Sequence, residues 1–236
     1  VRAYRFLRNL INGLRMLRGN AQDLFLPAFD TVEAAHLARR MGYSDRPDQS
    51  AGEQLRVDFE VETAAVRSFV ERHLGEEAIP SLPTGNPADL VLSDRLSEER
   101  SARVLQTAGF RNPSRGIVNL RRIAGSGPQR ETFARLLVLA WDYVIRSGDP
   151  DMALNNWERF TEQVTDRRAF FQELLSQPRR IEIMIVIFAG SQFLSDTLVR
   201  NPGFLNWISD ADVVTKPRDA LHMEAELEDL LAGTDE

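Results

Sequence analysis

Beyond residue 94 of this 236-residue chain, an Asn or Asp stands directly before a proline three times, at Asn112-Pro113, Asp149-Pro150 and Asn201-Pro202. An Asn or Asp side chain accepts a hydrogen bond from a free backbone N–H at a helix start, and proline fits the first helical position because its missing N–H would be unpaired there. Proline also disfavours helical geometry in the residue before it, so the preceding helix must end. Ser176-Gln177-Pro178 repeats the pattern one residue out of register. The four sites predict short helices that change direction at each joint.

Helical periodicity extends through nearly the whole chain. The first segment repeats apolar residues at steps of three and four, namely Tyr4, Leu7, Leu10, Ile11, Leu14 and Leu17. It should end at Gly19-Asn20, and further helices are expected from about Thr31 to Met41 and from about Gly52 to Leu74. The inward residues expected for this third helix are Phe59, Ala65, Val66, Phe69 and Val70. The predicted fold class is all-α, a multi-helix bundle of short helices joined by Asn/Asp-Pro turns.

One segment, residues 181–190, has a composition that favours a strand. Its sequence, IEIMIVIFAG, is rich in β-branched residues. However, Ile181, Met184, Ile185 and Phe188 keep helical spacing, and a single strand would have no partner in a helical chain. The segment is therefore predicted to be a fully buried helix.

A proline- and glycine-rich stretch suggests where the chain divides. Residues 75–94 contain three prolines and two glycines, which makes them the best candidate for a linker. The predicted division is a helical segment at 1–74, the linker, a central helical domain at 95–208 and an acidic C-terminal segment at 209–236. A long loop within one domain remains an alternative for the linker. Because the chain begins with valine, we expect it to be a piece of a longer polypeptide.

Composition excludes several classes of protein. The chain has no cysteine, so it can form neither disulfides nor thiolate metal sites and has no cysteine nucleophile. Its longest apolar run, residues 183–189, is far shorter than the roughly 20 residues that a membrane span needs. No signal peptide is recognisable. We therefore expect a soluble cytoplasmic protein without membrane contact.

The charges are polarised at the two ends of the chain. Residues 1–18 carry five arginines and no acid, whereas residues 209–236 carry nine acids against Lys216 and Arg218. A basic helix can bind RNA or phosphate, but no aromatic or glycine-rich nucleic-acid motif accompanies these arginines. A solvated helix face that meets an acidic neighbour is the favoured interpretation, and no nucleic-acid partner is expected.

Three stretches carry a resemblance to a known family. Residues 147–208, SGDPDMALNNWERFTEQVTDRRAFFQELLSQPRRIEIMIVIFAGSQFLSDTLVRNPGFLNWI, resemble the middle of the bifunctional glutamine synthetase adenylyltransferase/deadenylylase family. Residues 3–27, AYRFLRNLINGLRMLRGNAQDLFLP, with the LARRMGYSD that follows, are similar to the helices after that family's first catalytic domain. LQTAGFRNPSRGIVNLRRI resembles its next short helical pair. The resemblance covers residues 3–74 and 104–208.

The first stretch departs from the family pattern. The family usually has a glutamine and then a DxQT run before the Leu-Pro pair, where this chain has Arg15 and NAQDLFLP. By the resemblance, those residues lie near the first active site. That half of the parent enzyme is therefore expected to be altered or inactive.

Enzymes of this family carry two nucleotidyltransferase domains, each with a Gly-Ser turn and an Asp-x-Asp pair that hold magnesium and ATP phosphates. Carboxylates suit this task because Mg²⁺ prefers oxygen ligands and bridges the phosphates. Gly190-Ser191 followed by Asp210-Ala211-Asp212 has these letters, but the residues between them read as two helices. Asp149-Pro150-Asp151 fails because proline cannot sit inside a paired strand. We expect no catalytic, cofactor-binding or metal residues in this fragment, and ATP and magnesium only in the parent enzyme.

Other patterns favour structural roles. Gly125-Ser126-Gly127 lacks the lysine and spacing of a phosphate loop and is interpreted as an interhelical turn. His73 and Glu76 could share a helix face as metal ligands, but a third ligand is missing. The tryptophans stand at apolar helical positions and are predicted to lie in the core: Trp141, Trp157 and Trp207.

The resemblance implies a function for the parent enzyme. It would attach AMP to a tyrosine of glutamine synthetase and remove it, under control of glutamine and the PII signalling protein. Glutamine synthetase and PII are the partners implied. This fragment would be a non-catalytic regulatory or linker region that spaces the two catalytic halves and relays which is active. The alternative is a stand-alone helical scaffold or adaptor without nucleotidyl transfer.

Overall fold

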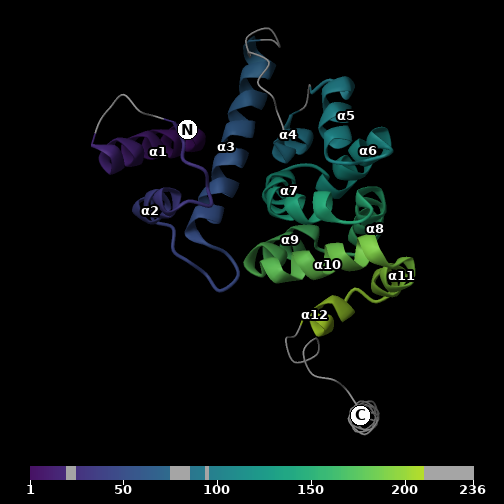
Figure 1. Ribbon diagram of the computed structural model, residues 1–236. Helices are drawn as coiled ribbons and strands as arrows, with labels where there is room; N and C mark the ends of the chain where they lie inside the picture. Colours follow the sequence, from purple (N-terminus) through teal and green to yellow (C-terminus); the bar gives the residue numbers. More distant parts are fainter. Residues whose placement is uncertain (20–24, 75–85, 94–95, 210–236) are drawn as a thin grey trace, which may run out of the picture. The chain divides into compact units, whose positions relative to one another are not determined.

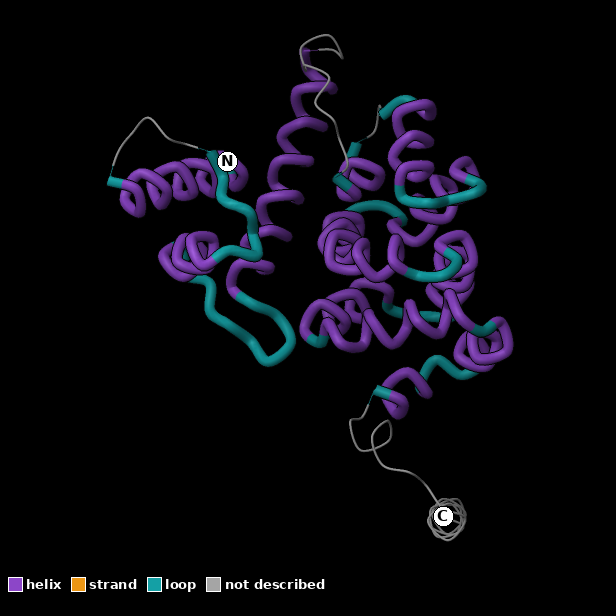
Figure 2. The backbone as a smooth tube through the Cα atoms, viewed as in Figure 1, coloured by secondary structure: helices purple, strands orange, loops and turns teal. Residues whose placement is uncertain are grey.

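The described residues of the computed structural model form helices joined by short loops (Figures 1 and 2). Residues 20–24, 75–85, 94–95 and 210–236 are not described. The helices are α1 (Arg2–Arg18), α2 (Val32–Arg40), α3 (Ala51–Leu74), α4 (Pro87–Leu92), α5 (Glu98–Thr107), α6 (Pro113–Ala124), α7 (Pro128–Arg146), α8 (Pro150–Glu162), α9 (Arg167–Ser176), α10 (Pro178–Gly190), α11 (Gln192–Arg200) and α12 (Phe204–Ile208). The prediction of an all-α fold is confirmed.

The chain divides into two compact units, residues 1–202 and 203–236. Helices α1 to α11 belong to the first unit. Of the second unit, the structure describes α12 and the residues beside it.

The Asn/Asp-Pro pairs act as helix starts at two of the three predicted places. Asn112 Oδ1 accepts a hydrogen bond from Arg115 N at 3.1 Å, and Asp149 Oδ1 accepts one from Met152 N at 2.9 Å. The proline that follows each of them is the first residue of α6 and α8, respectively. The capping mechanism predicted from the sequence is therefore confirmed at these two joints.

The third pair behaves differently. Asn201 ends α11, and its side-chain amide donates to the Thr197 carbonyl oxygen at 3.3 Å instead of capping the next helix. Helix α12 starts at Phe204, without a side-chain cap. The prediction of an Asn201 cap was wrong, because this side chain satisfies the end of the preceding helix. At Pro178 a helix does begin as predicted, also without a side-chain cap.

Helix α7 occupies the centre of the first unit. Every residue from Leu136 to Trp141 is buried, and six consecutive residues cover more than one full turn, so the helix is enclosed on all sides. It contacts α3, α4, α6, α8, α9 and α10. The Phe133 ring lies 5.5 Å from that of Trp157 and 5.3 Å from that of Phe171, between centroids. Aromatic packing on α7 therefore joins α8 and α9 to the core.

Residues 181–190 form most of α10, so the predicted helix is confirmed, but Val186 is 63% exposed and the prediction of full burial was wrong. The four residues at helical spacing are completely buried: Ile181, Met184, Ile185 and Phe188. Helix α10 packs on α7 and α8. Burial therefore overrides the β-propensity of its branched residues.

Helix α3 packs against two different groups of helices. It packs with α1 and α2 around an apolar cluster that includes Leu10, Leu14, Leu37 and Leu55. It also contacts α4 and α7. This double contact makes α3 the element that joins the first helices to the central helix (Figure 1).

The predicted inward face of α3 was wrong in part. Ala65 and Phe69 are exposed, whereas the other three predicted residues are partly buried and Phe59 packs against the apolar cluster. Val61 and Ala64 are buried instead. Because neighbouring helices cover α3 on two sides, its buried residues do not form the single stripe that helical periodicity assumes.

Part of the proline-rich stretch at 75–94 is a packed helix. Helix α4 is capped by Asn86 and contacts α3 and α7. The Arg67 guanidinium of α3 donates to both carboxylate oxygens of Asp89 at 3.0 and 2.9 Å. Residues 75–85 and 94 lie outside the described residues, so the linker and the division into domains stay predictions.

Replacement of Phe133 by alanine should destabilise the protein strongly. Its ring is fully buried between two other aromatic rings, and large-to-small changes at such positions cost about 3–5 kcal/mol. Urea unfolding followed by circular dichroism measures the loss. The matched control is Phe193→Ala, because the Phe193 ring is 78% exposed and should lose no more than about 0.5 kcal/mol. Equal losses for the two variants would contradict the assigned core.

Candidate functional site

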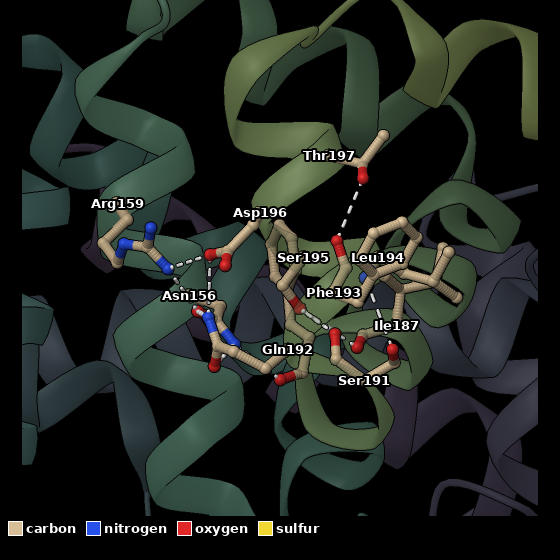
Figure 3. Close-up of polar contacts among 11 residues, drawn as sticks. Asn156, Arg159, Ile187, Ser191, Gln192, Phe193, Leu194, Ser195, Asp196 and Thr197 are labelled. Atoms are coloured by element: carbon tan, nitrogen blue, oxygen red, sulfur yellow. Dashed lines mark hydrogen bonds and ion pairs between the residues drawn. The ribbon is translucent and has the colours of Figure 1, made fainter.

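The Gly-Ser pair of the sequence lies at a helix joint. Gly190 ends α10, and Ser191 caps α11 by accepting a hydrogen bond from Leu194 N at 3.3 Å (Figure 3). Asp210 and Asp212, the acids that would complete a nucleotidyltransferase motif, lie outside the described residues. What the structure describes of this pattern is therefore a connection between two helices.

Hydrogen bonds and an ion pair connect α8 to this helix joint (Figure 3). The buried Asn156 amide donates to the Phe188 carbonyl oxygen at 3.0 Å, and Gln192 Nε2 donates to Asn156 Oδ1 at 3.1 Å. Arg159 Nη1 donates to Asp196 Oδ1 at 2.7 Å. These contacts hold the α10–α11 connection at a fixed place on α8, which is a structural task.

The second acidic pattern, Asp149-Pro150-Asp151, is also engaged by the backbone. Asp149 caps α8, and the Asp151 carboxylate accepts hydrogen bonds from Arg111 N at 2.7 Å and Asn112 N at 3.0 Å. Asp149 therefore stabilises the start of α8, and Asp151 stabilises the turn that precedes α6.

The remaining sequence patterns have different outcomes. Gly125 ends α6 and Gly127 precedes α7, both with positive φ, so the predicted interhelical turn is confirmed. The His73 ring stacks on Phe69, with 4.2 Å between centroids, and Glu76 lies outside the described residues. Within the described ranges, no three His, Asp or Glu side chains gather as metal ligands would.

None of the described helices combines the length and hydrophobicity that a bilayer crossing requires.

The prediction for the tryptophans holds for two of the three. Trp141 and Trp157 are buried. Trp207 is 51% exposed, so its placement in the core was wrong. It stands in the five-residue helix α12, where helical spacing carries little information about burial.

The candidate functional site is an ionic junction between α1, α3 and α7, which the sequence analysis did not identify. We define the ionic junction by five residues: Arg2, Asp58, Glu62, Glu131 and Arg135. It joins the helices of residues 1–74 to the central helix.

Two arginines hold the acids of the ionic junction together. Arg135 of α7 pairs with Asp58 of α3, and its Nη2 lies 3.6 Å from Glu62 Oε1. Arg2 of α1 bridges the same two helices, with Nε 2.7 Å from Glu62 Oε1 and Nη1 2.6 Å from Glu131 Oε1. Each arginine therefore binds carboxylates that come from both α3 and α7.

Burial controls the electrostatics of the ionic junction. The Glu62 side chain is only 7% exposed. Burial raises the pKa of its carboxyl, although Arg2 and Arg135 act to lower it. The neighbouring Tyr43 hydroxyl donates to Asp58, and burial together with this hydrogen bond raises the tyrosine pKa well above its usual range. The net free energy of the ionic junction is therefore the difference between the attraction of its opposite charges and the cost of their desolvation.

A sequence signal for the ionic junction exists. Asp58 and Glu62 are four residues apart in α3, and Glu131 and Arg135 are four residues apart in α7. Such pairs share a helix face. Which acid meets which arginine depends on the packing of α3 against α7, which periodicity alone does not show.

Comparison with curated proteins gives a consistent result. The Bifunctional glutamine synthetase adenylyltransferase/adenylyl-removing enzyme of Xanthobacter autotrophicus is 28% identical over 243 residues, which cover 99% of this chain and 23% of that protein. The enzyme of the same name from Stenotrophomonas maltophilia strain R551-3 is 30% identical over 244 residues, covering 99% of this chain and 25% of that protein. The Corynebacterium glutamicum enzyme is 23% identical over 212 residues, covering 89% of this chain and 20% of that protein.

Two further comparisons complete the result. A family model described as GlnD PII-uridylyltransferase matches residues 1–74. No solved structure matches the chain. The chain spans between 20% and 25% of the length of the curated relatives named above. The resemblance found in its motifs is confirmed: the chain is homologous to one segment of the bifunctional glutamine synthetase adenylyltransferase/adenylyl-removing enzymes.

Proposed function

We propose that the chain is a non-catalytic helical coupling segment of a glutamine synthetase adenylyltransferase/adenylyl-removing enzyme. The observation that carries this proposal is similarity along almost the whole chain to about a quarter of each relative. The name of these relatives describes the attachment of AMP to glutamine synthetase and its removal. In the proposed parent, ATP and magnesium act in the other parts, glutamine synthetase is the substrate, PII is a regulator, and the location is the cytoplasm.

The ionic junction supports a coupling role. Helix α3 shares an apolar cluster with α1 and α2 and a charge network with α7. Separating ionic partners that are largely buried leaves uncompensated charges, so a small displacement of α3 is energetically costly. A movement of the first three helices would therefore be transmitted to α7, around which the following helices pack.

The use of the acids supports a non-catalytic role. Asp149 and Asp151 accept hydrogen bonds from backbone N–H groups that would otherwise be unpaired. If these carboxylates turned away to bind a metal, the backbone N–H groups would lose their hydrogen bonds, which costs free energy. Neither acid stands on the rigid strand that phosphoryl transfer requires.

The purified chain should neither bind Mg-ATP measurably nor transfer AMP to glutamine synthetase. Calorimetric titration with Mg-ATP, together with a radiolabelled AMP-transfer assay, measures both. The same titration on the double variant Asp210→Asn/Asp212→Asn is the control. Micromolar binding that disappears in the double variant would establish a nucleotide site and refute the non-catalytic assignment.

Replacement of Arg135 by methionine should destabilise helices α1–α3 as well as α7. The change leaves Asp58 and Glu62 without one cation, and we expect a loss of about 2–4 kcal/mol, reduced by the partial exposure of Asp58. Under the coupling proposal, amide hydrogen exchange should accelerate in α1–α3 as well as in α7. Arg146→Met, at the exposed end of the same helix, is the matched control. Faster exchange confined to α7 would argue against coupling.

The stability of the ionic junction should depend on the ionisation of Glu62. Its pKa is raised from 4.5 in the folded chain, so the folded state holds the Glu62 proton more tightly than the unfolded state. The contribution of this group to the free energy of unfolding therefore falls as pH rises through the raised pKa. Glu62→Gln removes this titration. The wild type should gain stability relative to the variant as the pH is lowered from neutral to about 4.

Urea unfolding at a series of pH values measures this difference. Other carboxyls with raised pKa values, such as Glu60, titrate in both proteins and cancel in the comparison. The exposed Glu99→Gln variant is the control. A wild type that loses stability relative to Glu62→Gln on acidification would show that its ion pairs outweigh desolvation.

A further inference from the structure

A small cavity lies between α6, α8 and the start of α9. Its volume is about 230 Å³, and its lining residues are Arg122, Ile123, Glu158, Thr161, Glu162 and Arg167. Helices α6 and α8 pack side by side (Figure 1). Of the lining residues, the first two belong to α6 and the next three belong to α8. Arg167, the first residue of α9, closes one side by donating to the Arg122 carbonyl oxygen at 3.0 Å.

The innermost charged group of this cavity is the Glu158 carboxylate. Its side chain is 10% exposed, and its partner among the described residues is Arg122, with Nη1 3.1 Å from Glu158 Oε1. The Arg122 side chain is itself 64% exposed. An ionised carboxylate can accept about four hydrogen bonds. A nearly buried acid held by a single, largely solvated arginine therefore retains capacity for another donor.

Glu162 and Arg167 supply a second pair of opposite charges. They are not ion-paired with each other, and in the described part of the chain Glu162 has no hydrogen-bond or ion-pair partner. Arg167 uses one of its five donors on a backbone carbonyl and keeps the other N–H groups for a ligand. Among the described residues, an acid and a cation that both lack an ion-pair partner therefore border the same cavity.

The balance of charges restricts the class of ligand. With two arginines and two glutamates, the lining is neutral, so a phosphate group would meet two acids and a simple amine would meet two cations. A molecule that carries both an ammonium and a carboxylate satisfies both halves. We propose that this cavity binds a small aminocarboxylic acid, with its ammonium donating to Glu158 and Glu162 and its carboxylate accepting from Arg167.

The size and polarity of the cavity agree with this class. A volume of about 230 Å³ is below the 300–1,000 Å³ typical of pockets for drug-sized ligands, and it corresponds to about seven or eight water molecules. The fully buried Ile123 and Thr161 form its inner wall, and the Thr161 hydroxyl already donates to the Trp157 carbonyl oxygen. The ligand is therefore held mainly by its two charged ends.

Titration followed by NMR tests the proposal on the chain itself. Glycine, β-alanine and γ-aminobutyrate are the probes, because they separate the two charges by increasing distances, and methylammonium, acetate and inorganic phosphate carry only one kind of charge. At least one aminocarboxylic acid should give saturable shifts of the amide signals of α6, α8 and α9. Single-charge probes should bind at least about tenfold more weakly.

Two variants assign the two ends of the ligand. Glu162→Gln and Arg167→Gln should each weaken binding of the best probe by about 10- to 100-fold, because each removes a charge-assisted hydrogen bond. Both residues are at least partly exposed, so the fold should persist. The matched controls are Arg168→Gln, which is next to Arg167 and outside the cavity, and Glu99→Gln on α5.

The outcomes are distinguishable from those that test the parent enzyme, since no AMP transfer is measured. Saturable binding that the two cavity variants weaken and the two controls leave unchanged would support the site. Phosphate or acetate binding as tightly as the aminocarboxylic acids would overturn the ligand class. The absence of saturable shifts with all probes would show a cavity that holds only water.

Discussion

Burial of α7 on every side is the constraint on which the first unit depends. A helix whose consecutive residues from Leu136 to Trp141 are all apolar and buried cannot face water along any stripe, so other helices must enclose it. This requirement places α3, α4, α6, α8, α9 and α10 around it. Short connections make the enclosure possible, because each Asn/Asp-Pro cap ends one helix and starts another in a new direction.

Much of this arrangement could be predicted from the sequence, because its causes are local. Caps at Asn112 and Asp149 depend on two adjacent residues, and the helical assignment of 181–190 depends on spacing within ten residues. Predictions failed where burial is decided by distant segments. The inward face of α3 could not be found from periodicity, because α1 and α2 cover one side while α4 and α7 cover another. Asn201 shows that even a local motif has competing hydrogen-bond partners.

The candidate site was harder to predict than the fold. The acids noticed in the sequence, Asp149 and Asp151, are those whose spacing resembles a metal-binding pair, yet the backbone uses both. The ionic junction combines side chains from α1, α3 and α7, and Glu62 and Arg135 are 73 positions apart in the chain. Spacing in sequence detects chemistry that lies on one element. A network built from three elements becomes visible only when their packing is known.

The contrast between the two contacts of α3 bears on the proposed coupling. Its contact with α1 and α2 includes the Arg2–Glu62 ion pair but is centred on an apolar cluster, and apolar side chains can slide past one another with a gradual loss of buried area. Its contact with α7 includes directional ion pairs, whose energy changes steeply with separation when they are shielded from water. Desolvation makes such a network a weak source of net stability, so its presence at this interface is better explained by specificity of position. Under the proposed function, that property lets α3 define one register between the first three helices and α7, which an apolar contact of equal area would define less sharply.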